Sequence, residues 1–258
     1  AAEASFEDSD LKQAKLVGSN LTGANLSGTN LKDANLGGTG LQGVDLKNAD
    51  QGASLKKSNL GGTDSDAIEL TLVKVYPKGE RQNLTKANLT RANLSGANLE
   101  GANLNGVNLE NANLSDANLK NSNLENANLI GVEAVKANME NINLIGVNLS
   151  STNLSGVDLS GANLTGANLE GRNLAKVDLD NAILENANLS SVNLTGADLE
   201  NANLTGADLK NANLTDADLE GASGGDLAGA KICRTTMPDG KKSNASCPEI
   251  DTASSFGS

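Results

Sequence analysis

The sequence predicts an all-β solenoid in which short extended segments stack as the coils of a parallel β-helix. Three observations support this fold class. Apolar residues recur every five positions, a small residue stands two places before each of them, and Gly or polar residues follow each of them. A period of five fits neither an α-helix, at about 3.6 residues per turn, nor a plain strand, at about 2.0.

The main array runs from Leu84 to Leu219 and shows the unit most clearly. All 28 positions spaced five apart hold Leu except Ala134 and Met139, and Asn or Asp usually precedes each one. Alternate residues of an extended segment share a side, so the small residue and the Leu point inward while the Asn faces out. The polar residues or Gly that follow form a corner. Such coils can pair as a parallel ladder around a column of Leu side chains.

An earlier array begins at Phe6 and continues at the same spacing to Leu46, before Gln51 occupies a Leu position. Residues 61–82 then depart from the repeat. Their alternating β-branched run, which ends at Pro77, predicts a strand or hairpin excursion, and two degenerate repeats are the alternative. The expected divisions are N-terminal coils at 1–65, an insertion or degenerate excursion at 66–82, the main array at 83–232 and a C-terminal capping tail at 233–258.

The tandem unit A-(N/D)-L-X-X, present twice at residues 87–96 (ANLTRANLSG), resembles the pentapeptide-repeat family over roughly four-fifths of the chain. The resemblance implies a right-handed quadrilateral β-helix with four units, or 20 residues, in each coil. Right-handedness also agrees with the general rule for crossovers between parallel strands. On this reading the two arrays together form about ten coils.

The C-terminal tail holds both cysteines of the chain, Cys233 and Cys247, on either side of a Pro-Asp-Gly turn. Without His or a second Cys pair the ligand count excludes a zinc site. The spacing favours a disulfide, which would contribute about 3 kcal/mol through chain entropy and would pin a cap over the last coil. A reduced cytosolic pair is the alternative. The tail also resembles those of cyanobacterial members exported to the periplasm or thylakoid lumen, and this implies an exported protein.

Arg172 stands two residues before Leu174, where Ala or Val is usual. A charge that points into a dry column is costly, so we expect this side chain to bend out at a corner and keep its head in water.

Composition excludes several classes of function. The chain has no His and no Trp, and aromatic residues make up 1% of it. An imidazole base and the usual transition-metal ligands are therefore missing, and we expect no enzyme, no cofactor and no metal site. The net charge of −12 opposes binding of nucleic acid. No apolar run approaches the roughly 20 residues that span a bilayer, so no membrane insertion is expected.

Acidic residues are concentrated on one face of the main array. With 20 residues per coil, positions 20 apart stack on the same side, and two neighbouring columns hold a set that we call the acidic face: Asp158, Asp178, Asp180, Asp198, Glu200, Asp218 and Glu220. With Glu100, Glu140 and Lys120 in the same columns the sum is −8. Such a face either serves solubility or docks a basic partner or cations.

Two hypotheses follow. The first is a non-enzymatic β-helical scaffold or protein-interaction module, exported, with an unknown and basic protein partner. The second comes from the family resemblance, which includes DNA mimics that bind a type II topoisomerase in the cytosol. The acidic face favours the second, and the disulfide-ready tail opposes it. The sequence leaves the oligomeric state open.

Overall fold

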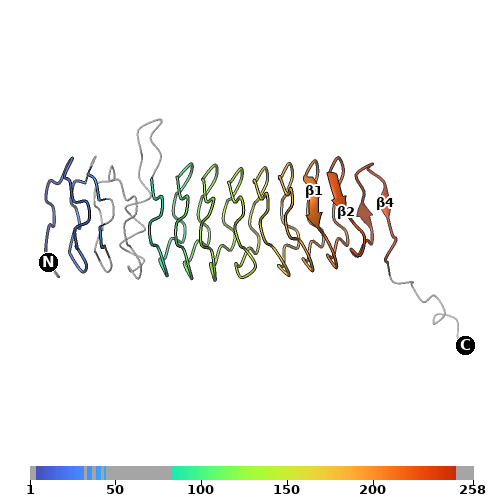
Figure 1. Cartoon of the computed structure of the whole chain (residues 1–258), viewed down its shortest axis with the longest axis horizontal. Coiled ribbons are helices and arrows are strands. Elements are labelled where there is room, and N and C mark those ends of the chain that lie inside the picture. Colours follow the sequence, from blue (N-terminus) through green and yellow to red (C-terminus); the bar gives the residue numbers. More distant parts are fainter. Residues whose placement is uncertain (1–3, 32–33, 37–38, 42–43, 45–82, 248–258) are drawn as a thin grey trace, which may run out of the picture.

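The computed structural model describes residues 4–31, 34–36, 39–41, 44 and 83–247. Figure 1 shows the described coils following one another along one long axis, with the blue N-terminal coils at one end and the red C-terminal segment at the other. The predicted insertion at 66–82 lies outside the described residues, and so does the choice between an excursion and two degenerate repeats.

Isolated parallel bridges join residues that are 20 positions apart, from Ser5↔Asn25 in the first array to Asp198↔Asp218 in the second. Twenty residues hold four five-residue units, so a coil can pair with the next at four positions. The stacking predicted from the sequence is therefore present in both arrays.

Hydrogen bonds of the backbone explain why the unit takes this form. Leu89 N–H donates to the Asn108 carbonyl at 2.7 Å, and Asn108 N–H donates to the Ala87 carbonyl at 2.9 Å, so neighbouring coils exchange bonds on both sides of the Asn. Within the unit, Ala92 N–H donates to the Leu89 carbonyl at 3.0 Å and closes the corner. The second corner residue has a positive φ, 59° at Arg91, a conformation that favours Gly and Asn.

The core is a stack of Leu side chains with small residues beside them. Leu144 and Leu164, one coil apart, are both 0% exposed. A few hydroxyl residues occupy the small-residue slot, and Thr152 Oγ1 donates to the Leu129 carbonyl of the preceding coil at 2.9 Å. Ser122 occupies the same slot, but its buried Oγ has no hydrogen-bond partner among the described residues.

The Arg172 side chain is less exposed to solvent than the sequence predicts. The residue is half-buried, and its Nε is enclosed without a hydrogen-bond partner among the described residues. Its backbone keeps the repeat, because Arg172 N–H donates to the Leu169 carbonyl at 3.0 Å and the Arg172 carbonyl accepts from Asn193 N–H at 2.8 Å. The ladder is nevertheless interrupted beside Arg172, because no bridge joins Asn153 to Asn173.

The last coil is shorter than the other coils that the structure describes. Strand β1 (Asn203–Asp208) pairs in parallel with β2 (Ser223–Asp226), and the register changes from Asn203↔Ser223 to Asp208↔Asp226. The separation thus falls from 20 residues to 18 within this pair. The next bridge, Asn213↔Lys231, keeps the separation of 18.

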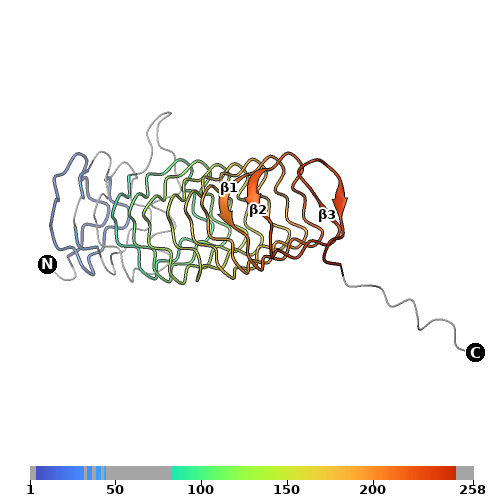
Figure 2. The ribbon, with the colours of Figure 1, turned by 45° about the vertical axis from the view of Figure 1, so that its right-hand side comes forward.

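A small hairpin follows the shortened coil. Strand β3 (Thr235–Thr236) pairs antiparallel with β4 (Lys242–Ser243), and both lie at the C-terminal end of the stack (Figures 1 and 2). Thr236 also belongs to the ladder, because its N–H donates to the Ala217 carbonyl at 2.9 Å. The hairpin is therefore directly continuous with the last coil. Among the described residues no helix has the length and hydropathy that a membrane span requires.

Candidate functional site

The four aspartates of the acidic face form one continuous column. Parallel bridges join Asp158 to Asp178, Asp178 to Asp198, and Asp198 to Asp218. The structure therefore brings these predicted residues together, one in each coil, at the ladder spacing of about 4.8 Å.

Each aspartate also organises the corner that follows it. Asp178 Oδ1 accepts a hydrogen bond from Asp180 N–H at 3.0 Å, and Asp198 Oδ1 accepts one from Glu200 N–H at 3.0 Å. This turn fixes the first carboxylate against the backbone and presents the side chain of the next acidic residue beside it. The second acidic column, Asp180, Glu200 and Glu220, is thus positioned by the first.

Asn in the same slot makes a bond that Asp cannot make. In an earlier coil of this column, Asn118 Nδ2 donates to Asn98 Oδ1 at 3.3 Å. On another face, Asn193 Nδ2 donates to Asn173 Oδ1 at 2.9 Å. An ionised carboxylate only accepts, so the stacked aspartates face one another without such a lateral bond.

The pKa values of two carboxylates of the face, Asp178 and Glu200, are raised. Burial, followed by the charges of Asp158, Asp198 and Asp180, raises the pKa of Asp178, although the amide hydrogen bond from Asp180 opposes this. The charge of Asp198 is the largest cause that raises the pKa of Glu200, and burial and the other acidic neighbours add to it. The face therefore carries mutual repulsion in the folded protein.

A single ion pair marks the N-terminal limit of the acidic face. Lys120 Nζ pairs with Glu140 Oε2. The hydrogen bond to Glu140 is the main cause that raises the pKa of Lys120, and the charges of Glu100 and Asp158 contribute. From Asp158 onward these two columns contain no cation up to Glu220, so the negative charge is concentrated in the C-terminal half of the array.

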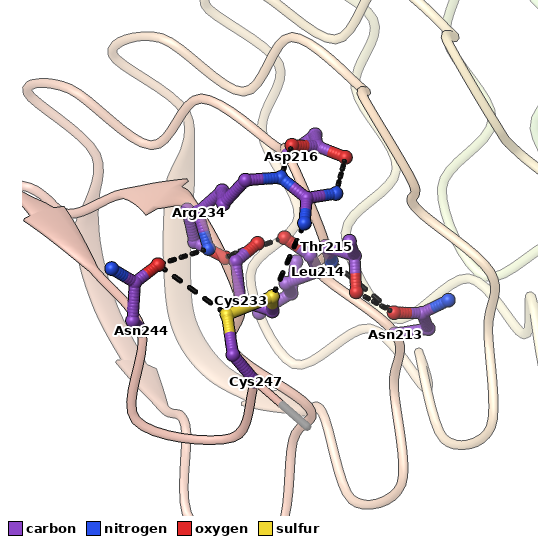
Figure 3. Close-up of a disulfide and its surroundings, with 9 residues drawn as sticks. Asn213, Leu214, Thr215, Asp216, Cys233, Arg234, Asn244 and Cys247 are labelled. Carbon is purple, nitrogen blue, oxygen red and sulfur yellow. Dashed lines mark hydrogen bonds and ion pairs between the residues drawn. A yellow bond between two sulfur atoms is a disulfide. The ribbon is translucent and has the colours of Figure 1, made fainter. Parts of the chain in front are cut away.

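The second predicted feature, the C-terminal cap, contains a disulfide. Cys233 and Cys247 are joined with a Cα–Cα distance of 4.6 Å (Figure 3). The bond closes the loop that carries β4, and Ser246 N–H donates to the Ile232 carbonyl at 2.7 Å beside it. Cys233 is buried, at 2% exposed. The tail is thereby attached to the end of the coil stack.

An Arg–Asp pair supports the cap from the last full coil. Arg234 donates from Nε to Asp216 Oδ1 and from Nη2 to Asp216 Oδ2, both at 2.6 Å, and Figure 3 shows the guanidinium lying across the carboxylate. The hydrogen bond from Arg234 is the main cause that lowers the pKa of Asp216. Sequence reasoning missed this pair. The two residues are 18 apart, so the signal appears only when the shortened coil is taken into account.

The charged groups of the acidic face and of the cap can bind and orient charged partners. In the part of the chain that the structure describes, no group of three or more His, Cys, Asp or Glu could hold a metal ion. The carboxylates of the acidic face follow the ladder at regular intervals, and one of them, Asp180, has its Oδ1 enclosed without a hydrogen-bond partner among the described residues. Such an array acts through electrostatic attraction and hydrogen-bond acceptance.

Comparison with known proteins identifies the repeat. The family described as pentapeptide repeats matches residues 4–43, 83–121, 122–161, 162–201 and 187–223, in eight copies. The chain belongs to the pentapeptide repeat family. Members of this family are right-handed quadrilateral β-helices, and they are generally structural or interaction modules rather than enzymes. The resemblance stated from the sequence is therefore confirmed.

Three solved structures illustrate the range of similar proteins. HetL, a pentapeptide repeat protein involved in heterocyst differentiation regulation from the cyanobacterium Nostoc sp. strain PCC 7120, is 30% identical over 94% of this chain and 92% of its own, with a TM-score of 0.42. A pentapeptide repeat protein from the Arabidopsis thaliana thylakoid lumen is 27% identical over 49% of this chain and 69% of its own, with a TM-score of 0.27. QnrB1, a plasmid-mediated fluoroquinolone resistance protein, is 13% identical over 88% and 92%, with a TM-score of 0.35. A search of curated protein sequences finds no match.

Proposed function

We propose that this pentapeptide repeat protein is a non-enzymatic scaffold that docks a basic protein partner on its acidic face. The observation that carries the proposal is the column from Asp158 to Asp218, in which parallel bridges stack four carboxylates coil upon coil. Where Asp stands in place of the more common Asn, the lateral hydrogen bond between coils is lost and electrostatic repulsion is added. A basic surface would relieve that repulsion.

The proposal includes the finer architecture expected from the sequence. A right-handed quadrilateral helix of about ten coils would comprise N-terminal coils at 1–65, an interruption at 66–82, the main array at 83–232 and the capping tail at 233–258. The bridges between residues 20 apart support the coil length, and the disulfide supports a separate capping role for the tail.

The proposed compartment is an oxidising one, the periplasm or the thylakoid lumen. Disulfides persist mainly in such compartments and are rare in the reducing cytosol. The bond between Cys233 and Cys247 supports this location.

A matched pair of variants tests the docking face. In the first, Asp158, Asp178, Asp198 and Asp218 become Asn. In the control, four carboxylates from other columns become Gln: Glu110, Glu125, Glu170 and Glu185. Both variants change the net charge by the same amount. The probe is a fluorescent oligolysine peptide, and its affinity is measured by anisotropy over a range of salt concentrations.

A docking face predicts that only the Asp→Asn variant loses most of its affinity for the peptide, and that wild-type affinity falls steeply with salt. Equal losses in the two variants would mean that the peptide senses net charge alone, and the proposed face would then be wrong.

DNA mimicry directed at a type II topoisomerase is the second candidate. The same column favours it, because a linear row of negative charge along a rod resembles one strand of a duplex in sign and regularity. Inhibition of DNA supercoiling by purified gyrase, lost in the Asp→Asn variant and kept in the Gln control, would select this candidate over the scaffold. No inhibition by the wild-type protein would remove it.

A further inference from the structure

One side of the main array lacks its backbone ladder beside Arg172. We call residues 151–157 and the residues that face them in the next coil, 170–178, the unpaired stretch. None of the N–H···O=C bonds that the repeat predicts joins these two described segments. The N–H groups left without a hydrogen bond there belong to Ser151, Leu154, Gly156, Asn173 and Asp178. The ladder resumes at Leu159, whose N–H donates to the Asp178 carbonyl at 3.0 Å.

The next pair of coils shows which bonds are missing. On the same side it forms the full set at 2.8–3.0 Å, and each donor lies 20 residues after an unpaired one: Gly171, Leu174, Lys176, Asn193 and Asp198. The ladder of side-chain amides is broken at the same place. Asn193 Nδ2 donates to Asn173 Oδ1 at 2.9 Å, whereas Asn173 Nδ2 makes no such bond to Asn153 in the described array.

A second interruption of the ladder is spanned by hydroxyl groups. No bridge joins Asn128 to Asn148, although both are described. Thr152 Oγ1 donates across this interruption to the Leu129 carbonyl at 2.9 Å, and a serine hydroxyl beside it accepts from Gly131 N–H at 3.2 Å. Across the unpaired stretch the described side chains make no hydrogen bond. The unpaired stretch is therefore the weaker of the two connections.

Arg172 occupies the inward slot at the unpaired stretch. In the coils before and after it the same slot holds Thr152 and Val192, and both are 1% exposed. The longer Arg172 side chain is half-buried, and its Nε is enclosed without a described hydrogen-bond partner. The Arg172 carbonyl still accepts from Asn193 N–H at 2.8 Å, so the bonds are lost toward the preceding coil and kept toward the following one. The loss coincides with the replacement of a small side chain by a long one.

We propose that Arg172 creates a flexible joint in the rod, at which the coils that follow it tilt against the coils that precede it. Segments with few backbone hydrogen bonds open at a low free-energy cost. The bridges Asp158↔Asp178 and Asn163↔Ile183 hold the neighbouring sides together, so the movement widens and narrows the unpaired stretch alone. The acidic column crosses the joint on a bonded side and stays continuous. This inference does not depend on the docking of a partner.

Hydrogen–deuterium exchange resolved at single amides tests the joint. After correction for intrinsic rates, the five unpaired amides should exchange roughly tenfold faster, or more, than the five bonded amides one coil later. Arg172→Val introduces the residue that Val192 provides in the next coil, and it should bring the two sets of rates together. Arg172→Ala should do the same with the commonest residue of this slot. Lys176→Ala removes a cation from the same side without changing an inward slot, so fast exchange should persist.

A distance measurement tests whether the rod bends at this place. Glu110 and Lys210 lie on one side of the array, five coils apart and on opposite sides of the joint, at about 24 Å by the ladder spacing. Spin labels at Glu110→Cys and Lys210→Cys should show a broader distribution of distances with Arg172 than with Arg172→Val.

Three results would overturn the proposal. The first is equal protection of the two sets of amides in the wild-type chain. The second is fast exchange that persists in Arg172→Val and Arg172→Ala variants whose far-UV circular dichroism shows folded coils. The third is a distribution of distances that Arg172→Val does not narrow.

Discussion

Exchange of Asp178 for Asn should stabilise the protein. Asp178 lies between Asp158 and Asp198 in the acidic column, and its pKa is raised by burial and by these neighbouring charges. The variant keeps Oδ1 as acceptor for the amide at position 180 and gains an Nδ2 donor that reaches toward Asp158. The new lateral hydrogen bond should contribute about 1 kcal/mol to the free energy of unfolding.

The gain should depend on pH in a defined direction. A raised pKa in the folded state means that Asp178 contributes stability below its unfolded pKa, about 4, and that this contribution is lost as the pH rises through the folded pKa. The Asn variant should therefore exceed the wild type near neutral pH and match it more closely at about pH 3, where Asp178 is protonated. Salt should reduce the neutral-pH difference by screening the repulsion.

The assay is urea denaturation followed by far-UV circular dichroism, with the reciprocal change as its control. Asn168 donates from Nδ2 to Asn148 Oδ1 at 3.3 Å and accepts from Asn188 Nδ2 at 3.1 Å. Asn168→Asp keeps the acceptor and loses the donor, so it should lower the urea midpoint at neutral pH. If Asp178→Asn leaves that midpoint unchanged or lowers it, the lateral hydrogen bond and the repulsion are not the forces that distinguish Asn from Asp in this slot.

Three further outcomes are expected. Titration of the unfolded, non-reduced protein should find no free thiol, and replacing both Cys233 and Cys247 by Ser should cost about 3 kcal/mol, measured by thermal or urea unfolding. Leu164→Ala should cost roughly 2–5 kcal/mol in the same assay, because the fully buried column cannot close around the hole without breaking its ladder. Gly166→Ala, with open space around the added Cβ, should cost about 1–2 kcal/mol through its positive φ, and Gly161→Ala should cost more because the new Cβ meets the Asn141 side chain.

The regular part of the structure could be predicted because one short unit repeats. A Leu every five residues predicts a buried column, and Leu144 and Leu164 are both fully enclosed. The 20-residue coil came from the family resemblance, and it is enough to place Asp158 and Asp178 against one another. The same backbone hydrogen bonds recur from one regular coil to the next whatever the exact side chains are. The five-residue period is therefore enough to predict these coils.

The irregular end could be predicted only in outline. The Cys spacing indicated the disulfide, but the pairing of Arg234 with Asp216 depends on a coil that is shorter by two residues. Packing decides at which corner the coil is shortened by two residues. At Gly224 an added Cβ would lie 2.6 Å from the Thr205 backbone, so this shortened corner requires Gly. A repeat count locates the change of phase and does not show which contacts the new register creates.

Arg172 shows a similar limit for single side chains. Its position in an inward slot was evident from the repeat, and a fully solvated head was expected from the cost of burying charge. The structure leaves the residue half-buried with Nε enclosed. The path of a long side chain depends on the local space between coils, and the five-residue pattern contains no information about that space.

The fold lets the surface charge of this protein change without a change in the backbone. Asn and Asp perform the same task at the corner, because either Oδ1 accepts the amide two residues later, as at Asn188 and Asp198. The slot can therefore exchange a neutral residue for a charged one without altering the backbone. Neutral side chains would retain the lateral hydrogen bonds, so concentrated Asp at Asp158 to Asp218 works against the ladder rather than for it. A rigid column with this property is suited to present charge to something outside the chain.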